Sequence, residues 1–286
     1  MPHTFRKLLH GGTAALCIIT AASALALYMA LRTEYDTAIR HFTLGAVWPT
    51  VSVILCVLGV LAAAVSAIGA RRFKAEAAPS PSASAAVFAS TLLGFLLFAS
   101  FIMDIRALSD AGLTWFARIL PALGGLSAFY FLALAVRKEP ASLSPLHAML
   151  SLLPILYAFL SVLNTFFDAS YAMNAPVKSA ELMMYLSMAL FFTAESRLTL
   201  QRQKTASYCL FAGICLVLCG TVGTAELIAS LTSPVYGFSM LECASVLVCA
   251  VYAAIRLFTL EDIPEEEIPA EAPAAETAAQ EENHEV

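Results

Sequence analysis

The chain has 286 residues, of which 60% are hydrophobic and 13% are charged. Soluble globular proteins carry roughly a quarter charged residues, so this composition excludes an ordinary soluble domain. Apolar stretches long enough to cross a bilayer recur along the chain, which indicates that lipid surrounds most of it. The sequence therefore predicts an all-α fold, a polytopic integral membrane bundle of helices.

Windows of about 20 apolar residues predict eight membrane-spanning helices. The expected spans, in chain order, are 11–31, 46–70, 83–103, 114–136, 147–167, 179–196, 206–230 and 238–258. The first stretch also fits a cleaved signal peptide, because Arg6 and Lys7 precede it and Ala24-Leu25-Ala26 resembles a cleavage site. The apolar run of such a peptide is usually about 7 to 15 residues, and the longer run here favours a retained span.

Lysine and arginine are divided unequally between the two ends of the predicted helices. Eleven lie on the side of the N-terminus and five on the other side. Cytoplasmic loops of membrane proteins are enriched in these residues, so the division predicts a multi-pass protein of the cell membrane with both termini in the cytoplasm. Residues 1–10 are then a cytoplasmic segment and 11–260 the transmembrane domain. The Pro- and Ser-rich stretch 74–84 is expected to be a flexible cytoplasmic loop.

The net charge of −5 comes from the C-terminal segment 261–286. This segment has ten acidic residues and no Lys or Arg, whereas the rest of the chain has 16 basic and 11 acidic residues. A segment rich in Glu, Ala and Pro cannot bury enough apolar surface to fold alone, so we expect a disordered acidic tail. It either keeps the protein soluble on the cytoplasmic side or binds a cytoplasmic protein partner.

The fifth span carries a polar stripe. Tyr157, Ser161, Asn164 and Asp168 follow one another at intervals of four, three and four residues, which places them on one helical face. Such a face is expected to meet protein or water rather than lipid. It either lines a solute site or makes hydrogen bonds that fix helix packing. Pro154 lies earlier in the same helix and frees a backbone carbonyl.

Acidic residues near the ends of the last three spans are further candidates for a binding site. Glu226 and Glu242 are expected at similar depth near one end of the seventh and eighth spans. If they face each other, the pair is a site for a proton or a cation; if they face apart, they are ordinary interfacial groups. Glu195 returns to the face of Tyr185 near the cytoplasmic end of the sixth span. It either continues a polar route inward or pairs with basic residues such as Arg197 in the exposed loop, and we expect the exposed ion pair.

The seventh span is rich in small residues. Cys215, Cys219 and Gly223 share one face, and Gly220 with Thr224 forms a second pair of small residues, so a neighbouring helix is expected to approach closely. All seven cysteines lie within spans and are expected to pack as small hydrophobic residues. A thiolate metal site at Cys215 and Cys219 is an alternative, but paired histidines are missing.

Sequence motifs that would name a reaction are absent. The chain has no phosphate-binding loop, no zinc-protease motif and no nucleophile elbow, and the sequence indicates no catalytic residue, metal or cofactor. Its basic stretches are short and adjacent to lipid, which excludes nucleic acid as a partner. The lipid bilayer is the partner that the composition does predict.

Three classes of function therefore remain. The sequence favours a transporter or permease-like protein that binds a small cationic or polar solute; its predicted ligands are Tyr157, Asn164, Asp168, Glu226 and Glu242. The second class is a non-transporting sensor or accessory subunit whose acidic tail recruits a cytoplasmic partner. A membrane enzyme that uses the carboxylates as acid and base on a lipid substrate ranks last.

Overall fold

The computed structural model describes residues 2–38, 40–71, 75–77, 84–105, 115–136, 145–168, 172, 175–199, 204–231 and 239–262. The predicted disordered tail from residue 263 onward and the connection between the last two spans lie outside these residues. So does most of the predicted flexible loop 74–84.

Each of the eight predicted spans is a helix. The helices are α1 (Pro2–Thr33), α2 (Trp48–Ala70), α3 (Ser84–Asp104), α4 (Trp115–Val136), α5 (Pro145–Phe167), α6 (Pro176–Thr199), α7 (Thr205–Ser230) and α8 (Met240–Phe258). From α2 onward every boundary lies within three residues of the predicted one, because hydropathy marks the ends of long apolar helices clearly. Helix α1 begins nine residues earlier than predicted.

Of the eight helices in the described part of the chain, seven are long and apolar enough to cross a membrane. The exception is α6, which carries four charged side chains and is the most polar helix of the bundle. Large apolar side chains on the outside of the bundle are exposed, among them Val65, Phe88 and Phe95. Such a surface is stable in lipid but not in water. The protein is therefore a multi-pass integral membrane protein with a polar helix among apolar ones.

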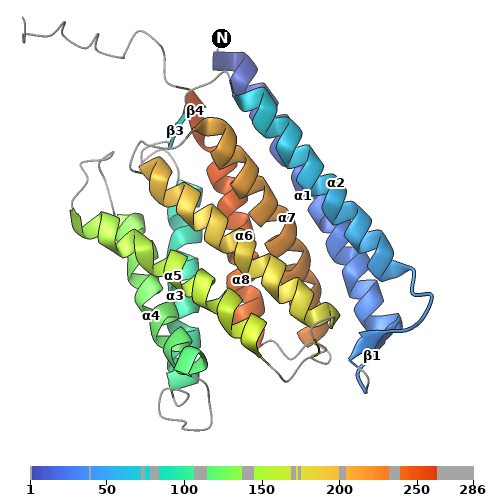
Figure 1. Ribbon diagram of the computed structural model, residues 1–286. Coiled ribbons are helices and arrows are strands. Elements are labelled where there is room, and N and C mark those ends of the chain that lie inside the picture. The colour runs from blue at the N-terminus through green and yellow to red at the C-terminus, as the bar shows by residue number, and fades with distance from the viewer. Residues whose placement is uncertain are drawn as a thin grey trace, which may run out of the picture.

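Six consecutive helices close into a ring. Each helix from α3 to α8 packs against the next one in the chain, and α8 packs back against α3. The hairpin of α1 and α2 lies outside this ring and contacts α7, as Figure 1 shows at the right of the molecule. Helix α7 consequently has neighbours on several sides and is the most buried membrane span.

The small residues of α7 allow this close packing, as the sequence predicts. A Cβ atom added at Gly223 would lie 2.8 Å from the backbone nitrogen of Leu247 in α8. One added at Gly220 would lie 2.5 Å from Cγ2 of Thr20 in α1. Glycine at these two positions lets α7 approach α8 on one side and α1 on another.

The connection between α1 and α2 is held by a carboxylate at a helix N-terminus. The strands β1 (Tyr35–Asp36) and β2 (His41–Phe42) form a short antiparallel hairpin. Glu34 accepts hydrogen bonds from the backbone N–H groups of Val47 (3.1 Å) and Trp48 (2.9 Å) at the start of α2. The carboxylate accepts hydrogen bonds from N–H groups that have no partner within the helix, and its negative charge interacts favourably with the helix dipole.

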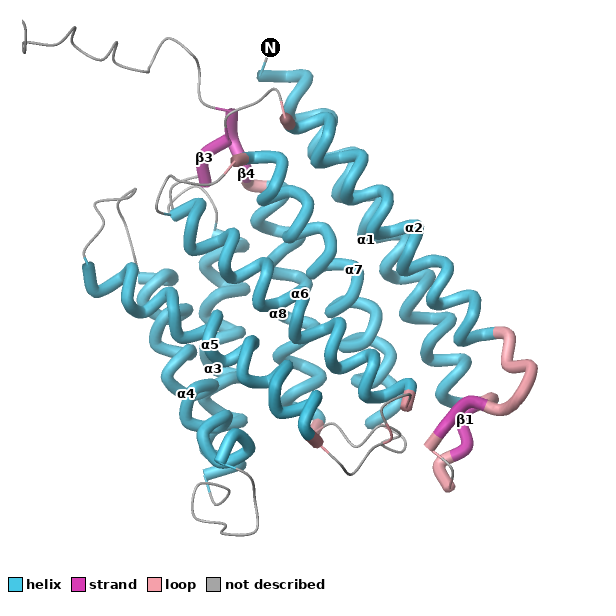
Figure 2. Tube along the Cα trace, in the orientation of Figure 1, coloured by secondary structure: helices cyan, strands magenta, loops and turns pink. Residues whose placement is uncertain are grey.

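A second short sheet lies at the other end of the bundle, near the start of α1. The strand β3 (Ala75–Ala77) pairs antiparallel with β4 (Leu260–Asp262), which directly follows α8. Figure 2 shows both strands beside the N-terminus, and we call this end of the molecule the N-terminal end. Part of the predicted flexible loop thus forms a strand with the first residues of the predicted tail, a pairing that the sequence does not indicate.

Candidate functional site

A cavity lies inside the helix ring, between α3, α5, α6 and α8. We call it the Glu242 cavity. It is lined by Leu93, Leu97, Ser100, Pro154, Tyr157, Tyr185, Met188, Phe192, Glu242, Ser245 and Val246. It gives the centres of water molecules about 20 Å³ of room, enough for about one water molecule.

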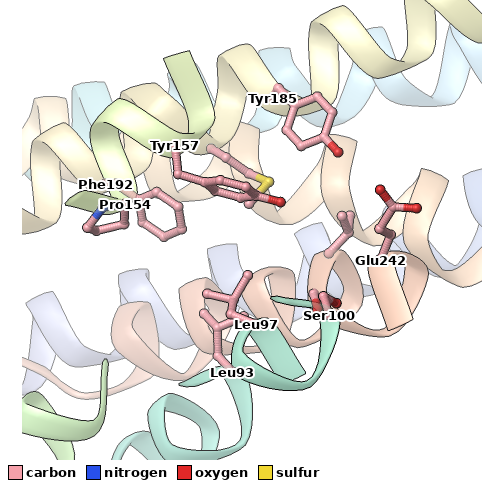
Figure 3. A pocket seen from close by; sticks show the side chains of 11 residues that line it. Leu93, Leu97, Ser100, Pro154, Tyr157, Tyr185, Phe192 and Glu242 are labelled. Carbon is pink, nitrogen blue, oxygen red and sulfur yellow. The ribbon is translucent and has the colours of Figure 1, made fainter. Parts of the chain in front are cut away.

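The polar groups of this cavity come from different helices. Tyr157 of α5 and Tyr185 of α6 point their hydroxyl groups toward the carboxylate of Glu242, as Figure 3 shows. Tyr157 lies against Gly124 of α4, where an added Cβ atom would be 3.3 Å from its ring. The absence of a side chain on α4 therefore leaves space for the tyrosine ring beside the cavity. At the opposite end, Pro154 and Phe192 close the cavity with apolar surface.

The carboxylates of Glu226 and Glu242 also share a second, smaller cavity. It lies between α6, α7 and α8 and has about 10 Å³ of room for the centres of water molecules. Glu226 is only 2% exposed, and Glu242 lines both cavities. Both predicted ligands therefore face the same cavity, whereas the sequence left open whether they face each other.

Glu242 has a structural contact in addition. Its backbone N–H donates to Oγ of Ser239 (3.2 Å), and its Oε2 accepts from the backbone N–H of Ser239 (2.8 Å). This reciprocal pair is a capping box, which stabilises the first turn of α8. The sequence signal for this contact is Ser239 followed three residues later by Glu242.

Two other predicted ligands lie apart from both cavities. Asn164 and Asp168 are half-buried near the end of α5 and line neither cavity. The ammonium group of Lys178, only 2% exposed, donates to the backbone carbonyl of Asp168 at 2.6 Å. Ser161 donates to the carbonyl of Tyr157 within its own helix, at 2.8 Å. The polar stripe of α5 is thus divided, and only Tyr157 reaches the Glu242 cavity.

Glu195 is not exposed, in contrast to the sequence prediction. It is 1% exposed, and its Oε1 lies 2.8 Å from Nε of Arg256 on α8. Tyr208 of α7 donates to its Oε2 at 2.6 Å, and Tyr252 of α8 donates to its Oε1 at 2.9 Å. These four residues form a buried group that we call the Glu195 cluster. The expected exposed pairing near Arg197 is wrong because α6 is rotated so that Glu195 faces α7 and α8.

An aromatic layer separates the Glu195 cluster from the Glu242 cavity. Phe192 lines the cavity, and its ring centre lies 5.6 Å from that of Phe131 and 5.7 Å from that of Phe191. Phe131 and Phe191 in turn pack against Tyr252, with ring centres 6.1 and 6.0 Å away. The inside of the ring thus contains a cavity, an apolar aromatic layer and a buried ion pair, in that order toward the N-terminal end.

The cysteines are buried or half-buried free thiols. Sγ of Cys215 lies 3.7 Å from Sγ of Cys219 and 3.9 Å from Sγ of Cys249, in the packed region between α7 and α8. Within the described part of the chain, no group of three or more His, Cys, Asp or Glu side chains is placed to hold a metal ion. The thiols therefore have the contacts of small packing residues.

Comparison of this chain with protein-family models, curated proteins and solved structures finds no match.

Proposed function

We propose that this protein is a permease-like membrane protein that binds a small cation in the Glu242 cavity. The observation that carries the proposal is the convergence of Tyr157, Tyr185 and Glu242, from three helices, on one cavity inside the ring. Ionisable groups that face the interior of a membrane bundle are costly, and they commonly mark the paths of ions or solutes.

The charge of the two cavities favours a cation over an anion. Glu226 and Glu242 are the charged residues that line them. The remaining polar lining groups are the thiol of Cys243 and four hydroxyls, which offer neutral oxygen ligands: those of Ser100, Tyr157, Tyr185 and Ser245. The room inside the Glu242 cavity suits an ion of about the size of a water molecule, so a larger polar solute requires the helices to separate.

We expect monovalent cations to stabilise the purified protein against heat in a concentration-dependent way. A ligand at 100 times its dissociation constant adds about 2.7 kcal/mol to the free energy of unfolding. Thermal melts in lithium, sodium, potassium and ammonium chloride, at constant ionic strength with a bulky organic cation, measure this effect. Glu242→Gln is expected to abolish it, because glutamine keeps the capping box but removes the charge.

Asp168→Asn provides the matched control for this experiment. Asp168 is acidic and lies near the same end of the bundle, but it lines neither cavity. The variant should therefore keep the cation response of the unaltered protein. A response that survives in Glu242→Gln, or that disappears equally in Asp168→Asn, would contradict the proposed site. So would the absence of stabilisation by every cation tested in a protein that melts cooperatively.

The distribution of lysine and arginine predicts from which side of the membrane the cation reaches the site. If the N-terminal end of the bundle faces the cytoplasm, the Glu242 cavity lies in the outer half of the membrane and the Glu195 cluster lies in the inner half. Both termini are then cytoplasmic, in the cell membrane. The site is in this arrangement placed to receive a cation from outside.

A second candidate function, recruitment of a cytoplasmic protein by the acidic tail, has one observation in its favour. The pairing of β4 with β3 holds the start of the tail against the connection between α2 and α3. We expect a chain that ends at Asp262 to keep this sheet, its melting temperature and its cation response, and to lose only the partner. Co-purification with the full chain and with the shortened chain tests this, and a partner retained by both argues against the tail as the binding segment.

A further inference from the structure

We propose that the Glu195 cluster is a gate that closes the helix ring between the Glu242 cavity and the N-terminal end of the bundle. This inference rests on the proposed function, because the gate blocks the path of a bound cation from the Glu242 cavity to the N-terminal end. Its members come from three adjacent helices of the ring, α6, α7 and α8. Any separation of these helices at this end must break the cluster.

The contacts of Glu195 show how the closed state is held. One oxygen of its carboxylate meets Arg256 at 2.8 Å and Tyr252 at 2.9 Å, and the other accepts from Tyr208 at 2.6 Å. Glu195 is thus the common acceptor that joins α6 to α7, its neighbour in the ring, and to α8. The two tyrosine hydrogen bonds to the carboxylate are charge-assisted, and such bonds are short and directional, so a small shift of α6 weakens them together with the ion pair.

The position of the cluster along the helices is the second argument. Glu195 lies about one turn before the end of α6 at Thr199, and Arg256 lies two residues before the end of α8 at Phe258. Charges so close to a helix end regain water when the helices part, which offsets the loss of their ion pair. An ion pair in the middle of a membrane has no such alternative. The cluster is therefore suited to two states, one closed and dry and one open and hydrated.

The third argument is the aromatic layer. Phe192 lines the Glu242 cavity, and Phe191 packs on the rings of both tyrosines of the cluster, with ring centres 6.3 Å from Tyr208 and 6.0 Å from Tyr252. When the ion pair holds α6 against α8, these rings fill the space between the cavity and the cluster. Release of Glu195 therefore frees the apolar layer as well, and the cavity then gains a connection to the N-terminal end.

Thiol labelling of a cysteine placed in the cavity tests the gate. Ser245 lines the Glu242 cavity, and cysteine has nearly the same size. The Ser245→Cys variant is reconstituted in vesicles and exposed to a membrane-impermeant maleimide from one face at a time. Mass spectrometry of peptides separates position 245 from the seven native cysteines. With Glu195 intact, we expect slow labelling from the face that carries the N-terminus.

Adding Glu195→Gln is expected to raise the labelling rate from the N-terminal face by about tenfold or more and to leave the rate from the opposite face unchanged. Ser196→Ala is the matched control, because it removes the 2.7 Å hydrogen bond between Ser196 and Ser151 at the same end of α6. If Glu195→Gln does not fold, the Tyr208→Phe/Tyr252→Phe variant tests the gate instead. It keeps the ion pair and should raise the labelling rate from the N-terminal face by a smaller factor.

Two outcomes overturn the gate: no increase in the folded variants, or an equal increase in Ser196→Ala. The cation melts separate this failure from that of the proposed function. If cations stabilise the protein but labelling does not change, only the gate is wrong. If labelling increases but no cation stabilises the protein, the cation site is wrong, and the ring still opens at the Glu195 cluster.

Discussion

Replacement of Arg256 by alanine is expected to lower the free energy of unfolding by about 3–5 kcal/mol, because it leaves a buried carboxylate without its charge partner. Glu195 is 1% exposed in the closed ring. The free energy is measured by reversible titration with a denaturing detergent in mixed micelles. A loss of this size is large compared with the roughly 5–15 kcal/mol that stabilise a typical fold.

Two further variants give this prediction its controls. Arg197→Ala removes a positive charge from the same end of α6, but Arg197 is exposed, and the change should cost less than about 0.5 kcal/mol. Glu195→Met/Arg256→Met removes both charges and should cost much less than Arg256→Ala, since no charge stays buried. If Arg256→Ala were as mild as Arg197→Ala, the ion pair would not hold the helices together.

The second large effect is expected at the contact between α7 and α8. Gly223→Ala places a Cβ atom 2.8 Å from the backbone nitrogen and 3.2 Å from Cα of Leu247. Backbone atoms cannot move aside by changing a rotamer, so α8 must shift as a whole. We expect a loss of about 1–3 kcal/mol in the free energy of unfolding, the usual result of overpacking.

Gly11→Ala is the matched control and should have the opposite sign. A Cβ atom at Gly11 would meet nothing within 4 Å, and the residue lies inside α1. Alanine is better than glycine in a helix by about 1 kcal/mol, so this variant should melt at a higher temperature. If both variants stabilise the protein, α7 and α8 are not in the close contact described above. Gly223→Ala should also weaken cation binding, because Glu242 lies on the displaced helix.

The positions of the helices could be predicted from the sequence because they depend on local hydropathy. The small-residue faces of α7 could also be predicted from the sequence, because Gly220 and Gly223 lie close together in the chain. The rotation of each helix about its axis has no such local signal. Glu195 is paired with a residue of α8 rather than with the arginine two positions away, and only the packing of the whole ring decides between the two.

The candidate site was predictable in part. Glu226 and Glu242 share a cavity because the small face of α7 brings α8 close, although the sequence leaves their relative direction open. The sequence places Tyr185 on one face of the sixth span with Glu181 and Met188, but this spacing does not show which of these side chains reaches a cavity. Asn164 and Asp168 share a helical face with Tyr157, but that face is longer than the cavity. A helical repeat indicates which residues are neighbours, and it does not say where a cavity ends.

The closure of the ring by α8 has a consequence for how the protein is made. The chain enters the membrane from its N-terminus, so α6 is inserted while α8 is still being synthesised. Tyr252 follows Glu195 by 57 residues and is synthesised much later than Tyr208, which is only 13 residues away. During this interval Tyr208 is the partner that is already available to the carboxylate. Chains cut short before α8 should consequently be recognised as unfinished and degraded.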